Sequence, residues 1–370
     1  MVMPEEVSEQ SVLRMSTLID PKKKTEYILC ISFNQDKTCI ACGTNYGYKI
    51  YNSRNFKKIG DRDLDKPIAK IQMLYRSNLL LLVLGSADNM RSGNTLIFWD
   101  DKTNDTTGML TLKHNINKIK TRKDLIYVLH DVHVHIISME SLQIVKKVDT
   151  RGNAMAIFAC SYADSLKVIA YPSADRAAGY FTMYNVHNEK LMYINAHNHD
   201  VECIEMDYNG TVVASASKKG TIIRVFKVKD GTVLQEFRRG IDNAKIMSLC
   251  FDMTGSMLGL SSDSGTVHIY GINNEENEGK ESKSPISVKN KSSKLGIFKK
   301  AFKYFDSEWS TVQLKVDEKI VFVNFNADGS EVLVYKSTGK FWRYEFPKDN
   351  EKKKSQKIEL NEPIRLLKQG

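Results

Sequence analysis

The sequence predicts an all-β fold, a seven-bladed β-propeller of the WD40-like kind that forms a single domain. Strand patterns recur along the whole chain of 370 residues, whereas long helical patterns are scarce. One unit also recurs: a turn with Asn, Asp or Gly, a short apolar strand, a small polar turn, and a second strand that ends in aromatic or aliphatic residues. The unit repeats at about the period of 40–45 residues that is typical of four-stranded propeller blades.

Seven copies of this unit follow one another, at residues 33–52, 78–100, 124–138, 164–185, 207–227, 252–271 and 326–346. Their equivalent strand residues are Ile50, Phe98, Ile136, Tyr184, Val225, Ile269 and Tyr344. Successive equivalents are 38 to 48 residues apart, except for a last step of 75 residues. A single sheet cannot bury both of its faces, but seven sheets packed radially can. A two-domain all-β protein is the alternative, while the missing alternation of helices and strands argues against an α/β fold.

The composition fits a globular protein with a substantial core, since 42% of the residues are hydrophobic and 26% are charged. No run of 18 or more apolar residues predicts a transmembrane helix, and the polar, acidic first ten residues do not resemble a secretory signal. The six cysteines lie mostly in apolar strands, so we expect buried, reduced thiols. Cys39 and Cys42 form a lone CxxC, which without a second pair predicts neither a zinc site nor redox chemistry.

The net charge of +10 indicates an acidic partner: a nucleic acid, an anionic membrane or an acidic protein. An insertion at 273–308, between the sixth and seventh copies, favours an anionic membrane among these partners. If its second half is helical, apolar residues spaced i, i+3, i+7 and i+10 line one face and lysines occupy the others. Such a segment is typical of a membrane surface, although a loop helix folded back on the propeller would give the same pattern. The residues expected to insert are Leu295, Ile297, Phe298, Phe302 and Phe305.

Two adjacent arginines, Arg238 and Arg239, follow a predicted strand at 232–237. Side chains alternate across a strand, so the pair points to opposite sides and can serve two separate anion sites. Hydroxyl-rich turns with a glycine lie on either side in the sequence, at 215–221 and 261–268. The backbone N–H groups of such turns converge on an anion. Donors of these types suit a phosphorylated polyol better than a base or a peptide.

The same residues have a purely structural explanation. Ser, Thr, Asp and Gly recur in propeller turns for turn chemistry alone, and histidines commonly brace neighbouring blades. This explanation accounts poorly for two adjacent arginines.

The FRRG sequence at 237–240, with SASKKGTIIRVF at 215–226 and SSDSGTVHIY at 261–270, resembles the PROPPIN family. These are phosphoinositide-binding β-propellers of autophagy, called WIPI proteins in animals. The resemblance implies binding of phosphatidylinositol 3-phosphate and phosphatidylinositol 3,5-bisphosphate at two rim sites, with no catalytic activity and no cofactor. The implied first site comprises His197, Ser215, Ser217, Gly220, Thr221, Arg224 and Arg238. The implied second site comprises Arg239, Gly240, Ser262, Thr266 and His268.

The resemblance also implies that the 273–308 loop of the sixth blade enters the bilayer. The implied protein partner is an acidic coiled-coil scaffold of the autophagy lipidation machinery, and we expect Arg122 and Arg151 to contact it. We expect a monomeric cytoplasmic protein, peripheral on preautophagosomal, endosomal and vacuolar membranes. The pathway and the preference between the two lipids stay open.

Three other classes of function have less support in the sequence. No HExxH, GxSxG, Walker A or strand-linked GxGxxG motif supports an enzyme. Only the net charge suggests nucleic acid, since no nucleic-acid-binding module is present. A protein scaffold in vacuolar or endosomal trafficking, without essential lipid binding, is the remaining alternative. The cluster of His130, Asp131, His133 and His135 could suggest a metal, but we interpret these as surface or blade-packing histidines and expect no metal site.

Overall fold

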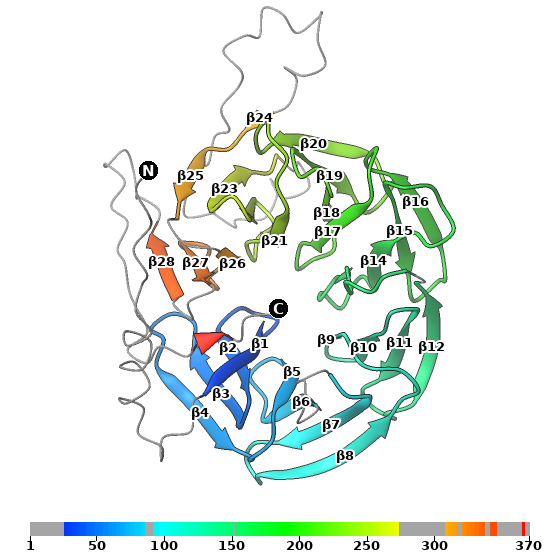
Figure 1. The fold of residues 1–370 in the computed structure, drawn as a ribbon. Coiled ribbons are helices and arrows are strands. Elements are labelled where there is room, and N and C mark those ends of the chain that lie inside the picture. The colour runs from blue at the N-terminus through cyan, green and yellow to red at the C-terminus, as the bar shows by residue number, and fades with distance from the viewer. Residues whose placement is uncertain are drawn as a thin grey trace, which may run out of the picture.

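The protein is a ring of seven β-sheets around a central axis (Figure 1). The structure, a computed structural model, describes residues 26–85, 92–150, 152–273, 308–316, 320–336, 341–345 and 365–366. All the regular elements in these ranges are strands. The predicted all-β, seven-bladed propeller is therefore confirmed.

The blades follow the chain in order. The first contains β1 (Tyr27–Phe33), β2 (Cys39–Thr44), β3 (Gly47–Asn52) and β4 (Lys58–Asp63). The second contains β5 (Ile68–Met73), β6 (Leu79–Leu84), β7 (Thr95–Asp100) and β8 (Asp105–Thr111). The third contains β9 (Lys118–Thr121), β10 (Leu125–Leu129), β11 (His133–Ser138) and β12 (Ile144–Asp149). The fourth contains β13 (Ala159–Cys160), β14 (Val168–Pro172), β15 (Tyr180–Asn185) and β16 (Leu191–Asn195).

The segment that follows the insertion supplies the last strand of both the fifth and the sixth blade. The fifth contains β17 (Val201–Met206), β18 (Val212–Ser217), β19 (Ile222–Lys227) and β20 (Val233–Arg238), with β24 (Glu308–Trp309) added at its edge. The sixth contains β21 (Ile246–Phe251), β22 (Met257–Ser262), β23 (Thr266–Gly271) and β25 (Val312–Lys315). The seventh contains β26 (Ile320–Phe325), β27 (Glu331–Lys336) and β28 (Phe341–Glu345).

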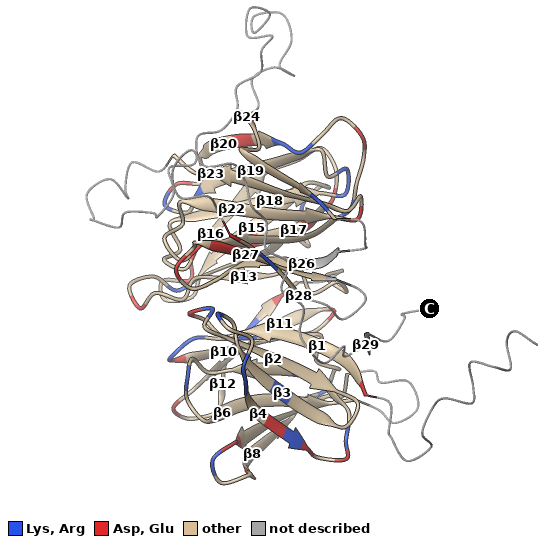
Figure 2. Cartoon of the chain, turned by 90° about the vertical axis from the view of Figure 1, so that its left-hand side faces the viewer, with Lys and Arg blue, Asp and Glu red and all other residues tan. Residues whose placement is uncertain are grey.

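Each predicted copy corresponds to the second and third strands of one blade, from β2–β3 in the first blade to β27–β28 in the seventh. The equivalent residues all fall on third strands. These strands are apolar because both of their faces pack against neighbouring blades. The outer strands β4, β8 and β12 instead alternate between exposed and partly buried residues, and Figure 2 shows charged residues on β4 while the inner strands are largely uncharged.

The core lies between blades, and it closes on itself. One cluster joins Phe181 of the fourth blade to Phe226 of the fifth, and the next joins Phe237 of the fifth blade to Leu260 of the sixth. The last joins Leu333, Tyr335 and Phe341 of the seventh blade to Ile28, Ile40 and Cys42 of the first. This continuous ring of interfaces excludes the two-domain alternative for the described residues.

The last described strand pairs with the first. β29 (Arg365–Leu366) runs parallel to β1 and pairs with Tyr27 and Ile28. It joins the first blade rather than the seventh. The six cysteines are free thiols. In the described part of the chain no helix is long and apolar enough to cross a bilayer.

Candidate anion-binding site

The two adjacent arginines lie at the end of β20, on the outer side of the fifth blade. On one side β20 pairs with β19, which places Arg238 opposite Ile222. On the other side it pairs in parallel with β24, which places Arg238 opposite Trp309. The amide of Arg239 donates to the carbonyl of Thr221 at 2.9 Å, which extends this ladder by one residue. The arginine pair is therefore held by backbone hydrogen bonds on a rigid sheet.

The side chain of Phe237 fixes the orientation of its neighbours. Phe237 is buried against the sixth blade, where its ring stacks on Tyr270 with the ring centroids 4.6 Å apart. Side chains alternate along a strand, so Arg238 belongs to the opposite face, which is turned toward the fourth blade. Phe226, on that same face, packs against Phe181 of the fourth blade.

Arg239 lies toward the sixth blade. Its Nε donates to the carbonyl of Gly220 at 2.9 Å, and a second nitrogen donates to the carbonyl of Asp242. Its positive charge helps to lower the pKa of His268, which places it near that ring in the sixth blade. Both arginines are largely buried, with exposed fractions of 6% for Arg238 and 9% for Arg239. The two side chains thus leave opposite faces of β20: Arg238 on the face toward the fourth blade, the first flank, and Arg239 on the face toward the sixth blade, the second flank.

The first flank contains a buried histidine and a second arginine. His197 Nε2 and Ser215 Oγ form a hydrogen bond of 2.9 Å, and both side chains are buried. Burial, with the nearby Arg224 charge, lowers the pKa of His197 to about 4, so the ring is neutral at pH 7. Arg224 forms an ion pair with Glu236 at 2.8 Å and donates to the carbonyl of Ala196. The structure brings His197, Ser215 and Arg224 together, but Arg224 already has an anionic partner.

Two glycines of the predicted sites differ in what they do. Gly220 has a φ of +63°, and a Cβ built there would lie 1.8 Å from the carbonyl oxygen of Ala244. Only glycine fits that turn, which also buries Ser217 and Thr221. Gly240 faces open space, with nothing within 4 Å of an added Cβ. Gly220 is therefore needed by the fold, whereas the backbone at Gly240 is accessible from outside.

The second flank is a connected chain of hydroxyl groups that ends at a histidine. Ser262 Oγ lies 2.7 Å from Ser264 Oγ and 2.8 Å from Thr266 Oγ1. Thr266 Oγ1 lies 3.2 Å from His268 Nε2, and His268 Nδ1 lies 3.1 Å from Ser310 Oγ. Burial lowers the pKa of His268 to about 4, and Arg239 acts in the same direction. Every predicted member of this site lies on or beside β23, β22 or the end of β20.

Sequence reasoning did not identify three residues of this region: Glu236, Ser264 and Ser310. Glu236 could have been found, because it lies two residues before Arg238 on the same strand face and directly opposite Arg224. Ser264 lies within the quoted downstream turn. Ser310 gives no sequence signal, since it reaches His268 from beyond the insertion.

Arg122 does not lie on an accessible surface. It is 1% exposed, forms an ion pair with Asp124, and donates to the carbonyls of Ser161, Ala163 and Leu166. The side chain braces the third blade against the fourth, so we no longer consider it a partner contact. Arg151 and the expected membrane-inserting residues Leu295, Ile297, Phe298, Phe302 and Phe305 lie outside the described residues.

Comparison with known proteins identifies the family. The PROPPIN family model matches residues 27–340, which include every strand from β1 to β27 and both candidate flanks. The chain belongs to the PROPPIN family.

Curated relatives of this PROPPIN chain include autophagy proteins. SVP1-like protein 2 of Neurospora crassa is 31% identical over 246 residues, which are 66% of this chain and 56% of that protein. Autophagy-related protein 18 of Dictyostelium discoideum is 31% identical over 250 residues, which are 68% of this chain and 66% of that protein. The matched region thus spans less than two thirds of either relative.

Solved structures share the propeller fold. Hsv2 of Kluyveromyces lactis, with its complete loop 6CD, superposes with a TM-score of 0.70 at 23% identity and covers 88% of this chain and 95% of that one. The complex of KlAtg21 with the coiled coil of AgAtg16 contains a chain with a TM-score of 0.67 at 20% identity, covering 87% and 95%. At these identities the structures support the fold of this PROPPIN chain.

Proposed function

We propose that this chain is a phosphoinositide effector that binds phosphatidylinositol 3-phosphate and phosphatidylinositol 3,5-bisphosphate at the two flanks of β20. One observation carries the proposal: Arg238 and Arg239 diverge from adjacent positions, and each flank has its own set of hydroxyl and histidine side chains. Membership of the autophagy-related PROPPIN family supports the same function.

Phosphate chemistry fits the second flank in particular. The bonds from Arg239 go to two neutral carbonyls, those of Gly220 and Asp242. A phosphate dianion is a stronger acceptor, because a hydrogen bond between two charged groups is roughly twice as strong as one between neutral groups. The open space at Gly240, beside the 71% exposed Ile241, offers an approach. The headgroup would displace the Asp242 carbonyl from Arg239.

Binding at two flanks of one rigid strand makes the interaction bivalent. Once one headgroup is bound, the second meets its site at an effective concentration set by the membrane, and avidity exceeds either affinity. Basic residues near an anionic surface contribute about 1 kcal/mol each, and the net charge of +10 favours such a surface. We include insertion of the 273–308 loop as part of the proposal, on the sequence pattern alone.

The proposed consequence is recruitment of autophagy machinery to a membrane by a non-catalytic, cytoplasmic, peripheral protein. The KlAtg21 neighbour is in complex with a coiled coil, which supports a coiled-coil partner for this chain also. The proposed partner is acidic, in keeping with the basic net charge. Arg122 is buried, so its side chain does not take part in that contact.

Liposome co-sedimentation tests the lipid step. We expect each of Arg238→Gln and Arg239→Gln to lower binding to liposomes with 3-phosphorylated inositides by about 10-fold or more, since each removes one charged fork from one flank. The double variant should not bind measurably. Arg54→Gln, an exposed arginine of the first blade, is the matched control and should bind like the unmodified protein.

Thermal unfolding of each variant separates a lost site from a lost fold. Equal sedimentation of the double variant and the unmodified protein would remove lipid binding as the function. A folded double variant that no longer binds lipid but still captures an acidic coiled coil would show that recruitment and membrane targeting are separate. Capture without any lipid binding by the unmodified protein would instead favour a trafficking scaffold.

A further inference from the structure

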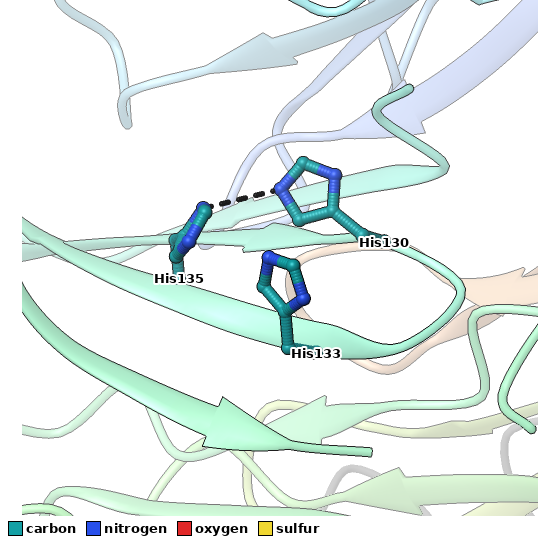
Figure 3. A group of neighbouring side chains, drawn as sticks. All are labelled: His130, His133 and His135. Carbon is teal, nitrogen blue, oxygen red and sulfur yellow. Dashed lines mark hydrogen bonds between the residues drawn. The ribbon is translucent and has the colours of Figure 1, made fainter. Parts of the chain in front are cut away.

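Three histidines of the third blade converge between blades, away from β20 (Figure 3). His130 follows β10, whereas His133 and His135 lie on β11, two residues apart and therefore on the same face. The intervening Val134 packs with the cluster that joins the third blade to the fourth, so the histidines face the opposite way, toward the second blade. The exposed fractions of the three side chains are 0%, 3% and 9% in chain order.

The spacing of the ring nitrogens suits a metal ion. One nitrogen from each ring can be chosen so that all three lie within 4.8 Å of one another. His130 Nε2 and His135 Nδ1 are 3.3 Å apart. Zinc bonds to imidazole nitrogen at about 2.0–2.1 Å, which separates two ligands of a tetrahedral ion by roughly 3.3–3.4 Å. One edge of the tetrahedron is therefore already present, and the third ligand needs to move by about 1 Å or more.

Hydrogen bonding fixes the tautomer of His130. The carbonyl of Asn115 lies 2.8 Å from His130 Nδ1. A carbonyl can only accept, so Nδ1 carries the proton and Nε2 keeps its lone pair. A backbone carbonyl on the outer nitrogen is the usual orienting partner of a metal-binding histidine. With a metal bound, the proton on His135 Nδ1, which now faces that lone pair, would transfer to His135 Nε2.

His133 provides the independent observation. Its Nε2 is buried and has no hydrogen-bond partner. A buried polar atom without a partner costs about 1–3 kcal/mol, a cost that packing alone does not explain. His197 and His268, also buried between blades, both have their hydrogen bonds. Packing histidines in this protein are thus satisfied, and His133 is different.

Some of the charges around the cluster oppose a bound cation and others favour it. Lys147 pairs with His135 across the strands and opposes a bound cation, although its side chain is exposed and therefore screened. Asp131, next in sequence to His130, acts the other way. Burial lowers the pKa of both His133 and His135 to about 4, so at pH 7 they are neutral, the form that binds metals.

We propose that His130, His133 and His135 form a binding site for a late first-row divalent metal, with Zn²⁺ the preferred ion. An all-imidazole donor set favours Zn²⁺ over Mg²⁺ or Ca²⁺, which require oxygen ligands. The exposed ring of His114 lies 5.3 Å from that of His133 and marks the side from which an ion enters. His114 and Asn115 belong to the connection from β8 to β9, so a bound ion fastens the second blade to the third.

The test uses the full chain, purified without a histidine tag and stripped with a chelator. We expect titration with Zn²⁺ to show one bound equivalent and to raise the unfolding temperature, while Mg²⁺ does neither. His133→Gln should weaken Zn²⁺ binding by more than the 10- to 100-fold that an outer-shell partner is typically worth. The control His187→Gln replaces an exposed histidine outside the cluster and should leave binding unchanged.

A second measurement does not depend on the variant folding. Co²⁺ bound to the unmodified protein should give the intense visible absorption of a tetrahedral ion with nitrogen ligands. The proposal is overturned if the unmodified protein binds no equivalent of Zn²⁺, if Co²⁺ shows only a weak octahedral spectrum, or if a folded His133→Gln variant binds Zn²⁺ as tightly as the unmodified protein.

Discussion

The rim around β20 and the histidine cluster beside β11 both contain buried histidines, but their hydrogen bonds suit them to ligands of opposite charge. At the rim, His197 is bonded to Ser215, and His268 is bonded to both Thr266 and Ser310. The guanidinium of Arg239 there donates to two neutral backbone carbonyls, and its positive charge attracts anions. In the third-blade cluster His133 Nε2 has no hydrogen-bond partner, and an imidazole nitrogen of this kind can bind a cation. The residue type alone does not distinguish the two; the hydrogen bonds do.

The largest expected effect is the loss of stability that lowering the pH causes through the rim histidines. His197 and His268 have folded pKa values of about 4 against a reference value of 6.5, so at pH 5 the unfolded chain binds more protons than the folded one. Stability is therefore full above pH 6.5 and falls as the pH drops toward 4. By pH 5 each histidine costs about 2 kcal/mol of unfolding free energy.

Urea unfolding at pH 7 and pH 5 measures this loss. The double variant His197→Gln with His268→Gln should show a smaller difference between the two pH values than the unmodified protein. An unchanged difference would mean that the hydrogen bonds of the rim histidines do not require neutral rings.

Substitutions at the two rim glycines, Gly220 and Gly240, are expected to have smaller effects that differ in kind. Gly220→Ala should destabilise the protein by about 2–3 kcal/mol, because its φ is +63° and its Cβ would meet the Ala244 carbonyl. Gly240→Ala should change the unfolding temperature little, since the space there is open, but should lower liposome binding severalfold. Comparable destabilisation by both substitutions would show that the fold needs a glycine at position 240, and that its role is not to leave room for a ligand.

Replacing one imidazole in each region gives the smallest effect and the most direct comparison. In the metal-free protein His197→Phe removes a partner of the buried Ser215 and should cost about 1–3 kcal/mol. His133→Phe removes a nitrogen that has no partner and should cost less. Chemical denaturation of the two variants, with chelator present, measures the difference. An equal or larger cost at His133 would argue that its ring is held by contacts equivalent to those of His197.

The sequence predicted the repeat well because its signal comes from the strands that are buried on both faces. Val225 and Ile269 lie on such strands, and their apolar runs stand out between glycine turns. The outer strands have a weaker pattern, since half of each faces solvent, as in β4 with Lys58 and Asp61. Short pairings such as β29 on β1 contain two residues each and have no periodicity at all.

The part of the candidate site that could be predicted consists of residues that lie close together in the sequence. The FRRG segment and the two turns are contiguous in sequence, and the alternation rule gave the two directions of the arginines. The carbonyls that hold Arg239 and the ion pair that holds Arg224 depend on how the blades pack. The same is true of Arg122, whose charge suggested a surface contact although the fold buries it against carbonyls of the next blade.

The parallel pairing of β24 with β20 has a mechanical consequence. The sixth blade contains β23, and the next strand that the structure describes, β24, belongs to the fifth blade, where Trp309 pairs with Arg238. Ser310 then reaches His268 in the sixth blade. A force on the segment 274–307 would therefore act on the backbone beside Arg238. It would also act on the hydroxyl groups of the second flank, through Ser310. A variant with a shortened or replaced segment can therefore lose anion binding for two reasons. The segment itself is changed, and β24 and Ser310, which follow it, are also part of the candidate site.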